Sequence, residues 1–135
     1  MDKRTKRIAW NKAWYEENKY TVKHRLMYAK TQAKKRKLSF ELTQNVYGSI
    51  IAKPCHYCEA DLSKSMGICL DRLNDELGYL ESNVVPCCGS CNKGRNSLFT
   101  PQEWKVMITA LKEWRKTQVP TLTPNVGSEL FSKQS

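Results

Sequence analysis

The spacing of apolar residues predicts two helices at the start of the chain. The first spans residues 3–18 and has only four apolar marks: Ile8, Trp10, Ala13 and Trp14. The second spans residues 21–37, and its apolar residues recur every three or four positions, as one helix face requires: Val22, Leu26, Ala29 and Ala33. We expect Trp10 and Trp14, four residues apart, to pack on the body of the protein; stacking on nucleic-acid bases is the alternative. A short third helix is predicted over residues 44–52, with Thr43 as its cap.

A further helix is predicted near the C-terminus. The run Thr100-Pro101-Gln102-Glu103 combines a cap, a proline in the first turn and a capping-box glutamate. Five apolar residues behind this start share one helix face, and we expect the stripe to be core: Trp104, Met107, Ile108, Leu111 and Trp114. Periodicity is lost from Gln118 onward, so residues 118–135 are predicted to be a flexible tail.

The middle of the chain favours two short strands. "GICLDRL" (67–73) is typical of a first strand and "NVVPCC" (83–88) of a returning one, with a turn at Gly78 between them. Another helix should begin within residues 89–92. The predicted fold class is therefore α+β and mostly helical, with basic N-terminal helices, a small two-stranded centre and a C-terminal helix.

The positive charge is concentrated in the first part of the chain. The whole chain has a formal charge of +10. Residues 1–40 contain 13 Lys and Arg against 3 Asp and Glu, whereas residues 41–135 contain 10 of each. A basic arm on a neutral body favours a polyanion as partner, because cations near phosphates release counterions. A merely solvated lysine-rich face is the alternative.

Hydropathy and cysteine content indicate the cellular compartment in which the protein is expected. The sequence has no run of 18 apolar residues and no apolar stretch behind the basic N-terminus, so neither a membrane span nor a secretory signal is expected. We therefore expect a cytoplasmic protein, in the host cytoplasm or nucleoid if it is phage-encoded. Six cysteines in a reducing compartment favour a metal site over disulfides.

Two cysteine pairs have the spacing of a structural zinc site. Cys55 and Cys58 form one pair, Cys88 and Cys91 the other, and 29 residues separate the pairs. Two thiolate pairs complete a tetrahedral zinc site, with an iron–sulfur cluster as the weaker alternative. Such a closed site is structural, so chemistry would need a second ion. Cys87 lacks the two-residue gap to Cys91, and Cys69 is expected to be a buried small hydrophobe.

From Leu38 to Arg95 the chain resembles the HNH nucleases of the ββα-metal type, especially short phage-encoded ones. The resemblance rests on "LSFELT", "PCHYC", "ICLDRLNDELGY", "NVVPCC" and "CNKGR" in that order. It implies a hairpin and a helix pinned together by the zinc clip. The implied organisation is a basic helical arm (1–40), an HNH-like zinc domain with its C-terminal helix (41–117) and the tail.

The resemblance also implies roles for single residues. Asp71 matches the family's metal-binding aspartate, and Asn92 matches its final metal ligand; together they would hold magnesium or manganese. Asn83 matches the asparagine that braces the loop. The expected phosphate- and nucleic-acid-binding cations are Lys93 and Arg95 beside the site, and on the arm Arg25, Lys34, Lys35, Arg36 and Lys37.

Arg72 departs from the family pattern, which has a histidine general base at this position. Arginine stays charged and accepts no proton. Loss of a general base costs about 10²–10⁴-fold, which is compatible with weak cutting. Arg72 is expected to clamp the scissile phosphate, and Tyr79 and His56 are candidate substitute bases.

Two functions follow from the sequence. The first is a metal-dependent endonuclease or nickase acting on DNA, as a monomer or homodimer. The second is a catalytically inactive zinc module that binds DNA or structured RNA, or acts as a phage regulator. The substitution at Arg72 favours the second, while Asp71 and Asn92 favour the first.

Overall fold

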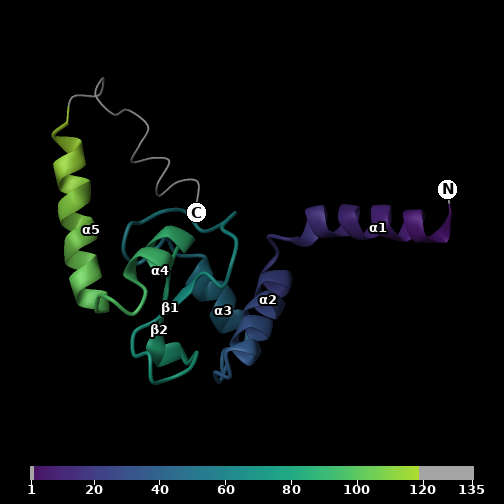
Figure 1. Ribbon diagram of the computed structural model, residues 1–135, viewed down its shortest axis with the longest axis horizontal. Coiled ribbons are helices and arrows are strands. Elements are labelled where there is room, and N and C mark those ends of the chain that lie inside the picture. The colour runs from purple at the N-terminus through teal and green to yellow at the C-terminus, as the bar shows by residue number, and fades with distance from the viewer. Residues whose placement is uncertain (1, 119–135) are drawn as a thin grey trace.

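The computed structural model describes residues 2–118; the predicted tail beyond Gln118 lies outside the described residues. The elements follow one another in the order α1 (Lys3–Asn18), α2 (Val22–Lys35), α3 (Gln44–Ile51), β1 (Leu70–Arg72), a 3₁₀ turn (Glu81–Asn83), β2 (Val84–Pro86), α4 (Gly89–Arg95) and α5 (Pro101–Lys116). The expected mostly helical α+β class is confirmed (Figure 1). None of the helices among the described residues is long and apolar enough to cross a membrane.

Side-chain caps set the starts of the predicted helices. Asp2, Thr21 and Thr43 each accept a hydrogen bond from a backbone N–H in the first turn of the helix that follows. Thr100 and Glu103 form the predicted capping box of α5, with Pro101 in its first turn. Each cap satisfies a donor that the helix itself leaves open, so these starts are encoded locally.

The two strands form a short antiparallel sheet. Its register pairs Leu70 with Pro86 and Asp71 with Val85. The first strand begins three residues later than the sequence predicts because Cys69 has a left-handed backbone, with φ of 62°. Its thiol accepts a hydrogen bond from Arg25 Nη2 at 3.1 Å, which holds this turn against α2.

The predicted extended link before α3 lies against the loop between the strands. Tyr79 N donates to Ser39 O, and Phe40 bridges to Tyr79. A Cβ on Gly78 would lie 2.6 Å from the backbone oxygen of Ser39, so only glycine permits this approach. The link therefore carries the C-terminal end of α2 to the rim of the hairpin.

Helices α1 and α2 differ in their relation to the core. Leu26, Ala29 and Ala33 of α2 are buried in one core with Tyr47 and Ile51 of α3. Helix α1 buries no side chain. Within the segment predicted as a basic arm, then, only α1 stands away from the body (Figure 1). The expected packing of Trp10 and Trp14 is wrong: they are 66% and 43% exposed.

The expected apolar stripe on α5 is core only in part. Ile108 is buried and Trp104 packs against the core, whereas Met107 and Trp114 are 43% and 59% exposed. Helix α5 lies at one edge of the molecule, so only one of its sides faces the body (Figure 1). A helical stripe becomes core only where another element covers it.

Candidate metal centre and nuclease site

The four predicted cysteines converge on one point. The ligand atoms of the cluster lie within 4.8 Å of one another, and all of its residues are buried: Cys55, Cys58, Cys88 and Cys91. Four sulfurs at Zn–S distances of ~2.3 Å in a tetrahedron are separated by ~3.8 Å. The Sγ atoms of Cys58 and Cys88 are 3.6 Å apart, which fits such an ion. The cluster is therefore a possible structural metal site of the kind that zinc occupies.

Local backbone geometry selects Cys88 over Cys87 as the cluster member. Cys88 is the N-cap of α4, and its Sγ accepts from Cys91 N at 3.4 Å. Cys88 N in turn points at Cys55 Sγ. Cys87 is buried beside them, and its contact with Cys55 together with burial raises the pKa of its thiol. The neutral Cys87 is a packing residue, as its spacing predicts.

Helix α5 closes over the first cysteine pair. Lys112 Nζ donates to Cys58 O at 2.8 Å, and Lys105 Nζ donates to His56 O. The indole of Trp104 packs closely on Gly94: a Cβ added to Gly94 would lie only 2.5 Å from the ring. The clip thus joins α4, the first knuckle and α5, which no sequence spacing indicates.

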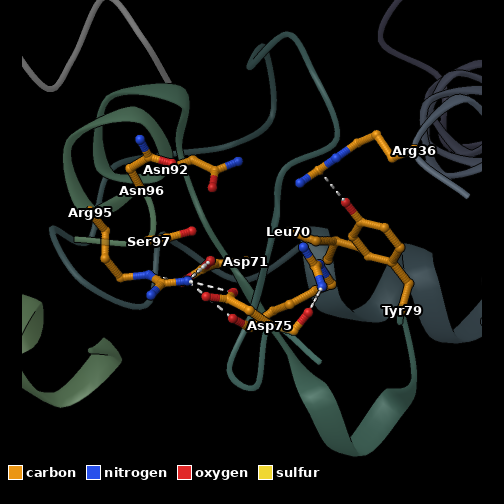
Figure 2. Close-up of a pocket in the computed structure, with 10 residues that line it drawn as sticks. Arg36, Leu70, Asp71, Asp75, Tyr79, Asn92, Arg95, Asn96 and Ser97 are labelled. Atoms are coloured by element: carbon orange, nitrogen blue, oxygen red, sulfur yellow. Dashed lines mark hydrogen bonds and ion pairs between the residues drawn. The ribbon is translucent and has the colours of Figure 1, made fainter. Parts of the chain in front are cut away.

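Asp71 is buried, and both of its carboxylate oxygens accept hydrogen bonds. Arg95 binds it in a two-pronged contact, with Nη2 to Oδ1 at 2.6 Å and Nε to Oδ2 at 2.7 Å. Tyr57 donates its hydroxyl to Oδ2 at 2.5 Å. Burial and this bond raise the pKa of Tyr57, so it stays a neutral donor. Arg95 reaches across the pocket to Asp71 in Figure 2.

This pairing corrects the expected place of Arg95. Its side chain is only 5% exposed and also donates to Phe99 O and Arg72 O, so it is not a surface phosphate contact in this structure. Its hydrogen bonds to Asp71 raise its pKa. Asp71 and Arg95 come from β1 and α4, so the pair also ties the hairpin to the helix. An ion at Asp71 would have to compete with this guanidinium.

Arg72 holds the loop that follows β1. Its Nη1 donates to Asp75 O at 2.7 Å and to Leu77 O at 2.9 Å, and its guanidinium lies 5.7 Å from the Tyr79 ring centre. The Tyr79 hydroxyl accepts from Arg36 Nη1 at 3.0 Å (Figure 2). The sequence gives no sign that Arg36, at the end of α2, meets this loop.

Arg36, Arg72 and Asn92 line one polar pocket of about 70 Å³ with the Asp71–Arg95 pair. Asn92 is exposed on α4, and Asn96 at the end of that helix lies on the same side of the pocket (Figure 2). The structure thus brings Asp71 and Asn92 to one pocket. Candidate base Tyr79 also lines it. His56 is not among the lining residues.

Of the other predicted cations, Arg25 is displaced from its expected place. It is 6% exposed and donates to Leu62 O at 2.7 Å, so it anchors the loop before β1 instead of meeting solvent. The remaining cations are all exposed: Lys34, Lys35, Arg36, Lys37 and Lys93. Periodicity already places Arg25 one residue from Leu26, but only the fold decides which flank of a helical stripe is covered.

Sequence reasoning missed Tyr57. The residue lies between Cys55 and Cys58 and is 1% exposed. Its hydroxyl connects the metal knuckle to Asp71. The only signal in the sequence is an aromatic residue inside a tight cysteine knuckle, which does not say where the ring points.

Asn83 is a buried brace of the strand-connecting loop. Its Oδ1 accepts from Asn74 N at 2.9 Å, and its Nδ2 donates to Asn74 O at 3.1 Å and to Gly78 O at 2.9 Å. The resemblance implies this geometry. These bonds hold the loop that carries Asp75 at the pocket rim.

We expect Asn83→Ala to lower the free energy of unfolding by about 2–3 kcal/mol, because it leaves buried loop groups without partners. Urea denaturation followed by circular dichroism measures this. Asn45→Ala, at an exposed position of α3, is the matched control and should change stability little. Equal stability of the two variants would contradict the bracing role.

Comparison with known proteins agrees with the fold. No family model matches the chain. A 72-residue stretch is 31% identical to an uncharacterized protein of Acanthamoeba polyphaga mimivirus, covering 53% of this chain but only 13% of that protein. The structure is similar to that of the rare-cutting HNH restriction endonuclease PacI, with a TM-score of 0.57 and 22% identity over 71% of this chain and 80% of that one.

At 22% identity this likeness concerns the fold. The assignment of the fold comes from the similarity of the whole structure, so it does not depend on which residue stands at position 72. The chain therefore has the HNH nuclease fold, with a possible structural metal site of four cysteines at its centre.

Proposed function

We propose that the protein is a metal-dependent HNH endonuclease that nicks DNA. The observation that carries the proposal is the polar pocket, in which Asp71 and Asn92 meet three arginines within an HNH fold. PacI, an HNH restriction endonuclease, is the structural neighbour that supports DNA as the substrate. One such site cuts one strand, so a monomer nicks and a homodimer cuts both.

Asp71 and Asn92 are the residues that would hold the divalent ion. Magnesium or manganese accepts such oxygen ligands, activates a water molecule and neutralises charge on the phosphate. Arg95 occupies both oxygens of Asp71 in this structure. A substrate phosphate is an alternative bidentate partner for its guanidinium, so substrate binding would help to free Asp71. Arg36 and Arg72 add positive charge to the lining of the pocket.

A supercoiled-plasmid assay tests the proposal. Wild-type protein with manganese or magnesium should give slow conversion to nicked circles, and EDTA should stop it. Linear product at low enzyme concentration would indicate a dimer. No cleavage of double-stranded, single-stranded or branched DNA in either metal would overturn the nuclease proposal.

A catalytically inactive nucleic-acid-binding module is the second candidate. It is favoured by the hydrogen bonds that Arg95 and Tyr57 donate to Asp71, which engage both of its carboxylate oxygens in this structure. It is also favoured by Arg72, whose Nη1 donates hydrogen bonds to the loop carbonyls of Asp75 and Leu77. Retained DNA or structured-RNA binding in the absence of any cleavage would establish it.

Arg72→His separates the two candidates. Histidine accepts a proton near neutral pH, so we expect the substitution to increase the nicking rate up to ~10²-fold. It also removes two hydrogen bonds to the loop, so its melting temperature must be measured beside its rate. Arg72→Gln, which lacks both the charge and a base, is the control and should be slower than wild type. If folded wild type and Arg72→His are both inert, the module is the better description.

A further inference from the structure

Helix α1 extends away from the body and is almost free of contacts. None of its 16 residues is buried. Its end meets the body through Trp14 and Tyr15, whose rings lie 5.7 Å and 5.6 Å from that of His24. At 1.5 Å per residue the 16-residue helix is about 24 Å long, and about 17 Å of it extends beyond Trp14. Figure 1 shows it pointing away from α2.

One face of α1 combines cations with exposed indoles. Positions 3, 7, 10 and 14 recur at helical spacing and share a face: Lys3, Arg7, Trp10 and Trp14. Lys6 borders it, four residues before Trp10. Trp10 is 66% exposed, so most of a large apolar side chain is in water. An exposed patch of this kind on an otherwise unpacked helix favours a binding partner.

The charge of α1 favours nucleic acid over a second copy of the chain. Helix α1 contains two acids, Glu16 and Glu17, both in its last turn, against five cations, all within residues 3–12: Lys3, Arg4, Lys6, Arg7 and Lys12. Self-pairing of two such helices would bring like charges together, which is destabilising. A phosphate backbone neutralises them instead.

Exposed lysines of α2 continue the charge toward the pocket. Lys23, Lys30 and Lys34 are spaced by seven and four residues, so they share one face of α2, and all three are exposed. The helix ends at Lys35, and its C-cap residue Arg36 lines the Asp71 pocket. Positive charge therefore runs from the pocket along α2 to α1.

We propose that the face of α1 formed by Lys3, Arg7, Trp10 and Trp14 binds the DNA duplex that flanks the segment engaged at the Asp71 pocket. The cations contact phosphates, and the indoles pack against sugars and base edges. The proposal rests on the proposed function only for its nucleic-acid partner and does not require cleavage.

Binding of the full chain to a fluorescein-labelled 30-base-pair duplex tests it by anisotropy at several salt concentrations. The variant W10A/W14A should bind about 10-fold more weakly. Stacking of one aromatic side chain on a base of a single strand contributes about 5- to 150-fold, and contacts with the sugars and base edges of a duplex lie near the lower end of that range. Trp114→Ala on α5 is the matched control, because Trp114 is 59% exposed but lies on another helix. It should bind as wild type does. The variant K3Q/R7Q should lower the slope of log affinity against log salt by about 1.8.

The variants should have melting temperatures close to that of the wild type, because α1 buries no side chain and the ring contact that W10A/W14A removes, between Trp14 and His24, is partly exposed. Wild-type affinity in W10A/W14A, or a loss equal to that of Trp114→Ala, overturns the proposal. So does a wild-type dimer in sedimentation that W10A/W14A abolishes while duplex affinity is unchanged, since the face would then bind a second copy. Duplex binding that depends on Trp10 and Trp14 in a protein that never nicks supports this proposal and overturns only the nuclease. If the protein nicks DNA and W10A/W14A binds the duplex as wild type does, the nuclease proposal is supported and the α1 proposal is overturned.

Discussion

We expect that removal of a metal ion bound by the four-cysteine cluster will unfold the protein. We expect metal analysis of the purified protein to find about one zinc per chain. The apparent binding free energy of such sites in small domains, about 10–16 kcal/mol, is comparable to or larger than the whole stability of a small domain, about 5–15 kcal/mol. The clip joins α4, the first knuckle and, through Lys112 and Trp104, α5. Far-UV circular dichroism during EDTA titration follows the loss.

Cys58→Ser should reproduce the effect of chelation without any chelator. Cys69→Ser is the matched control, because Cys69 is also a buried cysteine but lies outside the cluster. A serine hydroxyl can still accept the hydrogen bond from Arg25 that the thiol accepts. A native spectrum and melting temperature in metal-free protein, or equal effects of the two substitutions, would show that the clip is not a metal site.

Asp71→Asn will abolish nicking and destabilise the protein at the same time. The substitution removes the one carboxylate at the proposed ion site, so we expect the rate to fall at least about 10²-fold. It also leaves the buried guanidinium of Arg95 with only the partly exposed carboxylate of Asp75, 3.8 Å away, as a counter-charge, which costs up to about 3–5 kcal/mol. A plasmid assay and a denaturation curve must therefore be measured on the same preparation.

The double variant Asp71→Asn with Arg95→Gln separates the two effects. It removes both charges and leaves amides that can still bond to each other and to Tyr57, so much of the lost stability should return. Nicking should not return. Arg95→Gln alone is the control, because it keeps the proposed ion ligand. Cleavage by a folded double variant would show that Asp71 holds no catalytic ion.

The site shows a conflict between two uses of one carboxylate. In this structure Asp71 is a structural counter-ion that ties β1 to α4 through Arg95 and to the metal knuckle through Tyr57. The proposed nuclease needs the same oxygens for an ion. A carboxylate that must exchange an arginine for a metal is consistent with a slow enzyme, and it makes substrate phosphate the natural trigger of the exchange.

Local signals determined much of this protein from the sequence alone. The caps at Thr21, Thr43 and Thr100 set helix starts because the bonded groups lie within one turn. Cysteine spacing selected the four cluster members because a tight knuckle permits only a two-residue gap. The order of motifs likewise predicted the HNH fold and placed Asp71 and Asn92 near one another.

Tertiary structure alone decided which helix faces are covered and which partners side chains find. Periodicity cannot tell a covered stripe from an uncovered one, so Trp10, Trp14 and Trp114 were expected to be buried and are exposed. Long side chains such as Arg25 and Arg95 reach about as far as a helix is wide, so their partners come from segments distant in sequence, 44 residues away at Cys69 and 24 at Asp71. Both arginines were candidate nucleic-acid contacts and are structural instead. A buried charge without a partner is destabilising, so each guanidinium is held in the interior by hydrogen bonds to Asp71, Cys69 or backbone oxygens.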